Sequence, residues 1–220
     1  MGRTRTRYAG RRARRAVYDP VEANARLTAG TAAVLLVLLA AEGVTILQIH
    51  GLISEHVFIG MLLVPPVLVK TCSTVYRFAR YYLGAPEFRQ KGPPPILLRM
   101  LGPFVVLLTF AVLASGIALL FVGGSLRSQV LFLHKASFLF WLVAMAVHVL
   151  GHLLDTARVA PRDWMRRTRR SITGAGLRQW TIAASLVVGL LLGLLILARM
   201  APWQGSVPSA GQSPAPSARR

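Results

Sequence analysis

Long apolar segments alternate with short polar ones along most of this chain. Five segments each contain about 20 or more predominantly apolar residues, which is the length that crosses the roughly 30 Å hydrocarbon layer of a bilayer as an α-helix. They are Thr28–His50, Val57–Arg77, Leu101–Val122, Val130–Leu154 and Trp180–Arg199. The pattern therefore predicts an all-α membrane protein with five spans.

The connections between these spans predict how the helices pack. The segments GLISEH and GGSLRSQ are both very short, so the spans on either side of each must be antiparallel neighbours. We therefore expect the first four spans to form an antiparallel four-helix bundle. The fifth span is rich in Leu, Val and Gly and carries no ionisable group within the membrane, so it is predicted to be peripheral.

These expectations divide the chain into five parts. A basic cytoplasmic arm precedes the bundle, a basic cytoplasmic loop follows it, and a Pro- and Ser-rich disordered extracytoplasmic tail ends the chain. The predicted parts, in chain order, are the arm (residues 1–26), the four-helix bundle (27–154), the loop (155–179), the fifth span (180–200) and the tail (201–220).

Charge adds an orientation to this picture. Of the 26 Lys and Arg residues, eight precede the first span, five lie from Arg77 at the end of the second span to the start of the third, and seven lie between the fourth and fifth. The other ends hold few basic residues. This alternation places the N-terminus in the cytoplasm and the C-terminus outside, in a plasma membrane. Basic segments beside spans also attract anionic lipid. The net charge of +19 does not indicate nucleic-acid binding, because no recognition motif accompanies it.

All five histidines lie in or at the ends of three spans, and two of them share a spacing. His134 and His148 are fourteen residues apart, which is about 21 Å along a helix and within about 40° of a shared face. Two haems stacked across a membrane need ligands with this separation on one helix. Imidazole is a common axial ligand of electron-transfer haem.

The second span offers a partner imidazole at the outer membrane face. His56 is expected at the same depth as His134, and Gly60, one turn below, would let a flat macrocycle approach the backbone. Gly116 of the third span could serve likewise. The alternative for each histidine is a contact with headgroups or water. That alternative is favoured for His50 and for His152.

The segment LHKASFLFWLVAMAVHVLGH resembles the fourth helix of the bacterial cytochrome b561 and hydrogenase or formate-dehydrogenase cytochrome b superfamily. The segment EHVFIG is similar to the helix that holds the outer haem in that superfamily. The resemblance covers roughly Leu27 to Leu154. It implies a membrane b-type cytochrome that passes electrons between quinone and a partner redox protein, as a subunit of an oxidoreductase complex rather than a self-sufficient enzyme. An extracytoplasmic redox subunit is the implied partner.

Carried over by position, His56 and His134 would hold the outer haem b, and His148 would hold one side of an inner haem. The chain departs from the superfamily pattern at the inner site. The resemblance implies a second histidine either at the cytoplasmic start of the first helix, where the chain has NARLTAG, or fourteen residues after His56, where it has Lys70. An uncharged amine at Lys70 could ligate iron opposite His148. Alternatively, an ammonium there would pair with Glu42 or a propionate, or reach the inner interface. One haem per chain is therefore expected, with the inner site empty or weakly filled.

Two other functions stay open at this point. The chain could be a haem-free scaffold or assembly subunit whose histidines are packing and interface residues. It could also carry protons or a small solute by means of Glu42 and Lys70, both of which lie within predicted spans. In the second span, Pro65 and Pro66 are expected to kink the helix just above Lys70.

Overall fold

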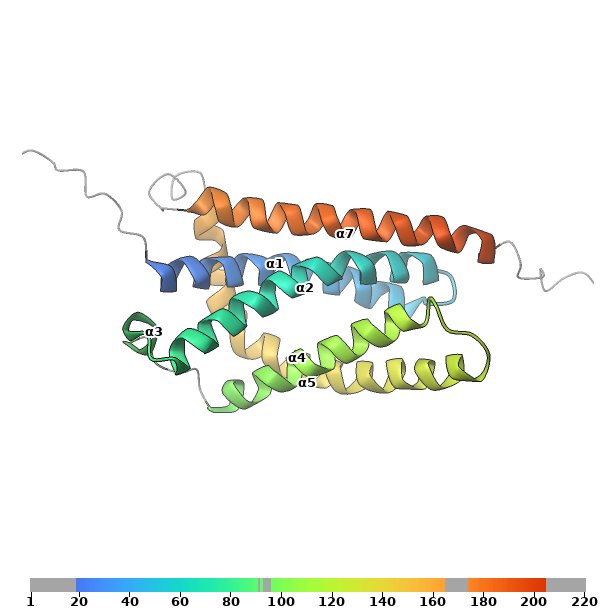
Figure 1. The fold of residues 1–220 in the computed structure, drawn as a ribbon, viewed down its shortest axis with the longest axis horizontal. Helices are drawn as coiled ribbons and strands as arrows, with labels where there is room; N and C mark the ends of the chain where they lie inside the picture. Colours follow the sequence, from blue (N-terminus) through green and yellow to red (C-terminus); the bar gives the residue numbers. More distant parts are fainter. Residues whose placement is uncertain (1–18, 91, 93–95, 165–173, 205–220) are drawn as a thin grey trace, which may run out of the picture.

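The computed structural model describes residues 19–90, 92, 96–164 and 174–204. Its elements are the helices α1 (Pro20–Leu47), α2 (Ile53–Tyr82), α3 (Pro86–Gln90), α4 (Ile96–Ala118), α5 (Gly124–Trp164) and α7 (Ala175–Gln204). Figure 1 shows α1, α2, α4, α5 and α7 running alternately in opposite directions, so that the start of α1 and the end of α7 lie at opposite ends of the molecule. The short α3 lies beside the end of α2.

Five of these helices contain a segment long and apolar enough to cross a membrane. The segments are Pro20–Leu47, Ile53–Tyr82, Arg99–Ala118, Gly124–Gly151 and Ala175–Arg199. Many large apolar side chains, such as Phe132 and Leu191, are exposed on the outside of the helices, as expected where lipid replaces water. The prediction of an all-α, multi-pass membrane protein is confirmed.

The first helix begins eight residues before the predicted span, because the sequence just before it is a helix start. Asp19 caps the helix, and its Oδ1 accepts from the backbone N–H groups of Val21 and Glu22 at 2.9 and 3.2 Å. Pro20 occupies the first helical position, where its missing N–H costs nothing. Arg26 then pairs with Glu22 one turn earlier, at 2.7 Å.

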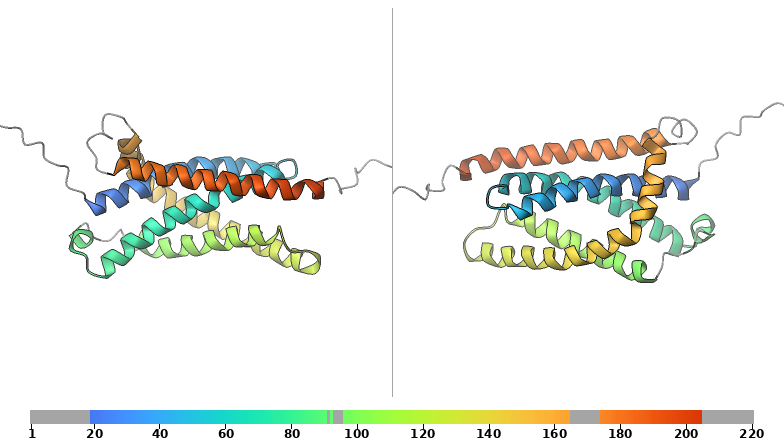
Figure 2. Two further views of the ribbon diagram at one scale, coloured as in Figure 1. Left: turned by 45° about the horizontal axis from the view of Figure 1, so that its top comes forward. Right: turned by 180° about the vertical axis from the view of Figure 1, so that it is seen from behind.

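The fifth span lies outside the other four, along α1 and α2 (Figures 1 and 2). Its contact with α2 is close, because Gly189 and Gly193 of α7 are both buried against it. A Cβ added to Gly189 would lie 2.5 Å from the carbonyl oxygen of Leu62, and one added to Gly193 would lie 2.7 Å from the ring of Phe58. Only glycine fits at these two positions without a shift.

The contact at Gly189 falls where α2 has a defect. Pro65 and Pro66 both lie inside α2, and Figure 1 shows the helix changing direction along its length. Pro66 has no N–H, so the carbonyl of Leu62, four residues earlier, lacks its usual helical donor. A glycine leaves room for that oxygen and presents a Cα–H group, which is a weak donor. The predicted kink thus coincides with the site where α7 packs.

The fourth bundle helix is longer than its predicted span. α5 continues to Trp164, through ten residues assigned above to the cytoplasmic loop, and bends toward the start of α7 (Figure 2). The expectations for most of the basic arm and for most of the extracytoplasmic tail fall on residues 1–18 and 205–220, outside the described part of the chain.

We call the two ends of the molecule the histidine end, which carries residues 48–52 and 119–123, and the arginine end, which carries the start of α1 and the α2–α4 connection. At the arginine end, Phe88 of α3 is only 3% exposed. It packs edge-on against Tyr76, and the guanidinium of Arg80 lies 5.8 Å from its ring centre. Arg99 of α4 contacts the hydroxyl of Tyr82. These contacts fix α3 and the connection to α4 beside α2.

Candidate functional site

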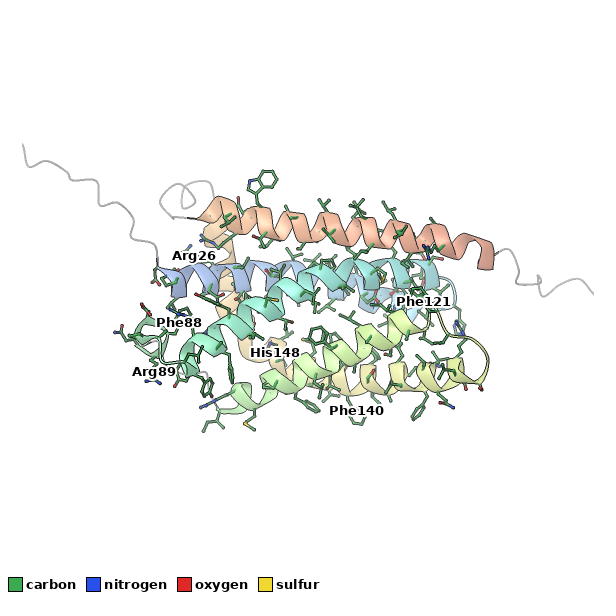
Figure 3. The ribbon with its side chains drawn as sticks, viewed as in Figure 1. Arg26, Phe88, Arg89, Phe121, Phe140 and His148 are labelled. Atoms are coloured by element: carbon green, nitrogen blue, oxygen red, sulfur yellow. The ribbon has the colours of Figure 1, made fainter. Side chains whose placement is uncertain are left out.

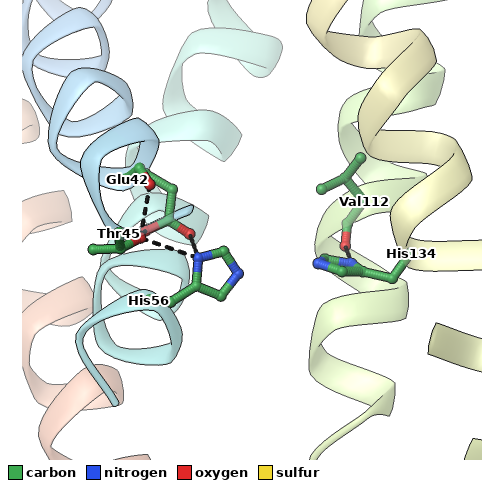
Figure 4. Close-up of polar contacts among 5 residues, drawn as sticks. All are labelled: Glu42, Thr45, His56, Val112 and His134. Carbon is green, nitrogen blue, oxygen red and sulfur yellow. Dashed lines mark hydrogen bonds and ion pairs between the residues drawn. The ribbon is translucent and has the colours of Figure 1, made fainter. Parts of the chain in front are cut away.

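Three polar side chains meet where α1 ends and α2 begins. Nδ1 of His56 lies 3.0 Å from Oε1 of Glu42 and 3.2 Å from the hydroxyl of Thr45 (Figure 4). Thr45 is 4% exposed, and its hydroxyl also donates to the backbone carbonyl of Glu42 at 2.7 Å. The short turn between the helices brings these groups together, because it makes α1 and α2 antiparallel. Nδ1 of His56 therefore has two oxygen partners on α1.

A second imidazole is held in the same manner by the α4–α5 hairpin. Nδ1 of His134 lies 3.1 Å from the hydroxyl of Ser115 and 3.1 Å from the backbone carbonyl of Val112. Ser115 is 4% exposed. The next residue, Gly116, has no side chain, and a Cβ there would lie 3.1 Å from Cε1 of His134. Glycine at 116 therefore lets the ring lie close against α4.

The two imidazoles face each other across the interior of the bundle. Their ring centres are 6.3 Å apart and their planes are inclined at 78°. In Figure 4 each ring turns its Nδ1 toward its own helix pair and its other nitrogen toward the opposite ring. No hydrogen bond among the described residues uses Nε2 of either ring. We call His56 and His134 the histidine pair.

The separation of the histidine pair matches that of two axial ligands on one metal. A metal–imidazole bond is about 2.0 Å long. A five-membered ring with bonds of about 1.35 Å has its centre about 1.15 Å from each atom. Two imidazoles on opposite sides of one metal therefore have ring centres about 6.3 Å apart, and the observed value is 6.3 Å. Metal binding also requires that each ring be held in one orientation. The hydrogen-bond partners of each Nδ1 meet this requirement, since a partner on one ring nitrogen orients the other toward the metal.

The pair does not by itself make a complete protein cage for a bare ion. Within the described residues, no three His, Cys, Asp or Glu side chains gather closely enough to hold a metal. A group that brings its own equatorial ligands and needs only two from the protein fits this arrangement. Haem is such a group.

Gly60 lies beside Glu42. A Cβ on Gly60 would be 3.6 Å from Oε1 of Glu42, which is an ordinary van der Waals contact, so the carboxyl group that holds His56 does not require a glycine here. Its predicted role next to a macrocycle stays a prediction.

Lys70 lies at the other end of the α1–α2 interface. Its Nζ donates to the backbone carbonyl of Thr28 at 3.3 Å, and the hydroxyls of Thr28 and Ser73 are 2.9 Å apart. Ser73 also donates to the carbonyl of Lys70 at 2.9 Å. We call Thr28, Lys70 and Ser73 the lysine cluster. The predicted ion pair between Lys70 and Glu42 is wrong, because Thr28 and Glu42 are fourteen residues, or about 21 Å, apart on α1.

The remaining histidines do not join the pair. His148 is half-buried on α5, well along the helix toward the arginine end (Figure 3), and its role and that of Lys70 as ligands stay predictions. His50 is exposed in the turn after α1. The side chain of His152 lies outside the described part of the chain.

Sequence reasoning missed the residues that orient the imidazoles. Thr45 and Ser115 are polar side chains inside apolar spans, and this is the signal that could have found them, since such residues need a partner within the bundle. The contact of α7 also had a signal, because GLLLG is a small-xxx-small pattern of the kind that packs membrane helices closely. The sequence alone does not say which helix it faces.

The fold and the site define the class of protein: a multi-pass helical membrane protein with two oriented imidazoles inside its bundle. Comparisons with family models, with curated proteins and with solved structures found no match. The function must therefore be argued from the site.

Proposed function

We propose that this protein is a membrane-embedded b-type cytochrome that binds one haem between His56 and His134 and transfers electrons. The observation that carries the proposal is the 6.3 Å separation of the two ring centres, with both Nδ1 atoms engaged and both Nε2 atoms turned inward. The haem would supply reversible one-electron exchange. The chain supplies two ligands from different helix pairs, so that binding ties α2 to α5.

The two ligands have unequal surroundings. The imidazole of His56 is held by the carboxyl group of Glu42 as well as by a hydroxyl, whereas His134 has a hydroxyl and a backbone carbonyl. A carboxylate partner makes an imidazole a stronger electron donor to a metal than a neutral partner does. Glu42 is thus proposed to orient His56 and to favour the oxidised form of the bound group.

The absorption spectrum tests this proposal directly. Purified protein should show a haem α-band in the reduced-minus-oxidised spectrum, and His56→Ala and His134→Ala should each abolish it while the protein stays in the membrane. His50→Ala is the matched control, because His50 lies at the same end of the molecule but is exposed in a turn. It should leave the band unchanged. A band that survives in both His56→Ala and His134→Ala would refute the assignment.

The orientation and the partners belong to the same proposal. The excess of Lys and Arg in the segments at the arginine end supports a cytoplasmic arginine end, with the histidine pair near the outer face of a plasma membrane. A haem there would exchange electrons with an extracytoplasmic redox subunit, while quinone would reach the protein through the bilayer. Reporter fusions after Gly92, Ser125 and Gln212 should read inside, outside and outside. Rapid reduction by a soluble cytoplasmic donor, with none by a quinol, would contradict this arrangement.

The proton- or solute-carrier alternative requires Glu42 and Lys70 to act on one path. Glu42 hydrogen-bonds at the histidine end and Lys70 at the arginine end, about four turns of helix away. The cytochrome is favoured because it accounts for both oriented imidazoles.

A further inference from the structure

Two guanidinium groups lie at the arginine end, where the end of α2, the short α3 and the start of α4 come together (Figure 1). Nε of Arg89, on α3, donates to the backbone carbonyl of Tyr81 at 3.4 Å. Arg99, on α4, contacts the hydroxyl of Tyr82, and its Cζ lies 5.3 Å from the centre of that ring. We call Arg89 and Arg99 the arginine pair. Its two members therefore contact consecutive residues at the end of α2.

The backbone turn after α2 brings Arg89 to this place. Gly84 has a φ of +92°; its N–H donates to the carbonyl of Tyr81, and the N–H of Ala85 donates to the carbonyl of Arg80. This is a Schellman motif, which ends a helix at a glycine in the left-handed conformation. A Cβ on Gly84 would lie 3.4 Å from a terminal nitrogen of Arg89, so the guanidinium packs against the turn. The motif folds α3 back beside α2 and sets where the Arg89 side chain lies.

Neither member of the arginine pair forms an ion pair within the described part of the chain. Their hydrogen bonds there are to a neutral carbonyl and a neutral hydroxyl. Arg26 differs, because it pairs with Glu22. In residues 71–118 the sequence has five basic residues and one acidic residue, Glu87. The arginine pair can therefore accept a negative charge from outside the chain.

The side chains next to the arginine pair indicate that this charge belongs to a lipid. Tyr82 is the last residue of one membrane-spanning segment and Arg99 is the first of the next, so the pair lies at the boundary of the apolar layer. Phe78 and Tyr82 on α2 are exposed, with ring centres 4.4 Å apart, and so are Met100 and Phe104 on α4. A guanidinium forms charge-assisted, often bidentate bonds to a phosphate. A phospholipid would match both features, whereas a soluble anion would leave the apolar side chains uncovered.

We propose that the arginine pair binds the phosphodiester of one phosphatidylglycerol-type anionic lipid, with the acyl chains along the exposed side chains of α2 and α4. The general attraction of basic segments to anionic lipid needs no fixed geometry, whereas this site requires two guanidinium groups held at the end of α2. A choline headgroup would bring its own positive charge to the pair, which opposes binding. The site shares no residue with the histidine pair and does not depend on haem.

Native mass spectrometry of the full-length protein in neutral detergent measures this binding. Wild type should bind phosphatidylglycerol about fivefold more tightly than phosphatidylcholine with the same acyl chains. Arg89→Gln and Arg99→Gln should each raise the dissociation constant for phosphatidylglycerol about fivefold, which is the expected contribution of one basic residue. Arg127→Gln is the matched control and should leave the constant unchanged. Arg127 also donates to a backbone carbonyl, that of Leu119 at 2.9 Å, but it lies at the histidine end.

The double variant Arg89→Lys with Arg99→Lys separates this site from general attraction. Both substitutions keep the positive charge, but an ammonium lacks the planar fork of donors that fits a phosphate. The lysine variant should bind phosphatidylglycerol more weakly than wild type and more tightly than Arg89→Gln with Arg99→Gln. Binding equal to that of wild type would show that charge alone is sufficient, and it would overturn the proposal.

Hydrogen exchange of the wild-type protein tests the same site without any substitution, so the test stands even where a variant fails to fold. Phosphatidylglycerol should slow amide exchange in peptides that cover residues 80–90, because the bound headgroup holds α3 against α2. Peptides that cover residues 119–128 are the internal control. Inorganic phosphate at millimolar concentration should neither protect residues 80–90 nor displace the lipid. Equal protection by phosphatidylcholine, protection by inorganic phosphate, or no protection by phosphatidylglycerol would each overturn the proposal.

Discussion

The contact between Glu42 and His56 and the contact between Thr28 and Lys70 occupy equivalent places on α1 and α2. Glu42 and Thr28 on α1 are fourteen residues apart, and so are their partners on α2, His56 and Lys70. At the histidine end, α1 fixes one nitrogen of the α2 side chain and the other is turned toward a ring on α5. At the arginine end, the α2 side chain ends on α1 itself. The same helix register thus gives two different results. His56 keeps one ring nitrogen directed toward α5, whereas the amine of Lys70 is hydrogen-bonded to α1.

The largest expected effect is on the number of haems per chain. Haem and protein measured on the same sample should give a ratio of about one, because a six-coordinate haem needs two axial ligands and, among the side chains that the structure describes, only the histidine pair supplies two facing imidazoles. Lys70→Ala and His148→Ala should leave this ratio unchanged. Lys70→His restores a ring at the equivalent place on α2 and should raise the ratio toward two. A wild-type ratio near two that falls to one in Lys70→Ala would make Lys70 a ligand.

The next largest effect should come from the glycines of α7. Gly193→Leu must displace Phe58, two residues from His56, and overpacking of this kind costs about 1–3 kcal/mol of stability. The variant should unfold at lower temperature in detergent. Its remaining haem should be lost more easily than in wild type, because the strain falls at the histidine end of α2. Gly43→Ala is the matched control, since a Cβ there meets nothing within 4 Å. Equal melting curves for Gly193→Leu and wild type would show that the packing of α7 does not stabilise the site.

Glu42→Gln should shift the haem midpoint potential upward by about 40 mV. A bond to a carboxylate is worth about 1 kcal/mol more than a bond to a neutral amide, and 59 mV corresponds to a tenfold change for one electron. The variant keeps an oxygen acceptor near His56, so haem content should not fall. Redox titration followed by the α-band measures the shift. A potential equal to that of wild type would show that the carboxylate does not act on the haem through His56.

The smallest effect should follow Ser115→Ala. This change removes one of the two partners of His134 Nδ1 and leaves the carbonyl of Val112 in place. The lost bond is worth about 0.5–1.5 kcal/mol at most, and the remaining acceptor keeps the ring oriented. We expect full haem content and a potential shift smaller than that of Glu42→Gln. A larger shift than Glu42→Gln would reverse the proposed ranking of the two imidazoles.

Much of this architecture was predictable because the bilayer restricts the alternatives. Long apolar segments must be helices, and short connections force antiparallel packing, so the five spans follow from the hydropathy pattern. Helix ends were less predictable, because the span limits were set by apolar length alone. Asp19 and Pro20 form a cap that starts α1 in a polar segment. α5 likewise continues past Leu154, where the apolar pattern ends.

The two facing imidazoles were predictable from the sequence, and the groups that hold them were not. His56 and His134 stand out because ionisable residues are rare in spans. Which groups hold them depends on the rotation of each helix, and hydropathy does not fix that rotation. Glu42 illustrates the difference. Its burial in a span was evident, yet its partner is His56 rather than Lys70, because α1 and α2 meet with Glu42 and His56 level near the turn.

The contact between Gly189 and the carbonyl of Leu62 has a consequence for the timing of assembly. A chain is synthesised from its N-terminus, so α7 leaves the ribosome after the other four membrane helices. Until then α7 is not packed against the turn of α2 that Pro66 weakens. The backbone from Phe58 to Leu62 can therefore fluctuate next to His56. The proposed haem would enter most easily in this interval, before α7 packs against α2. Chains arrested before Ala175 should therefore acquire and release haem faster than complete chains.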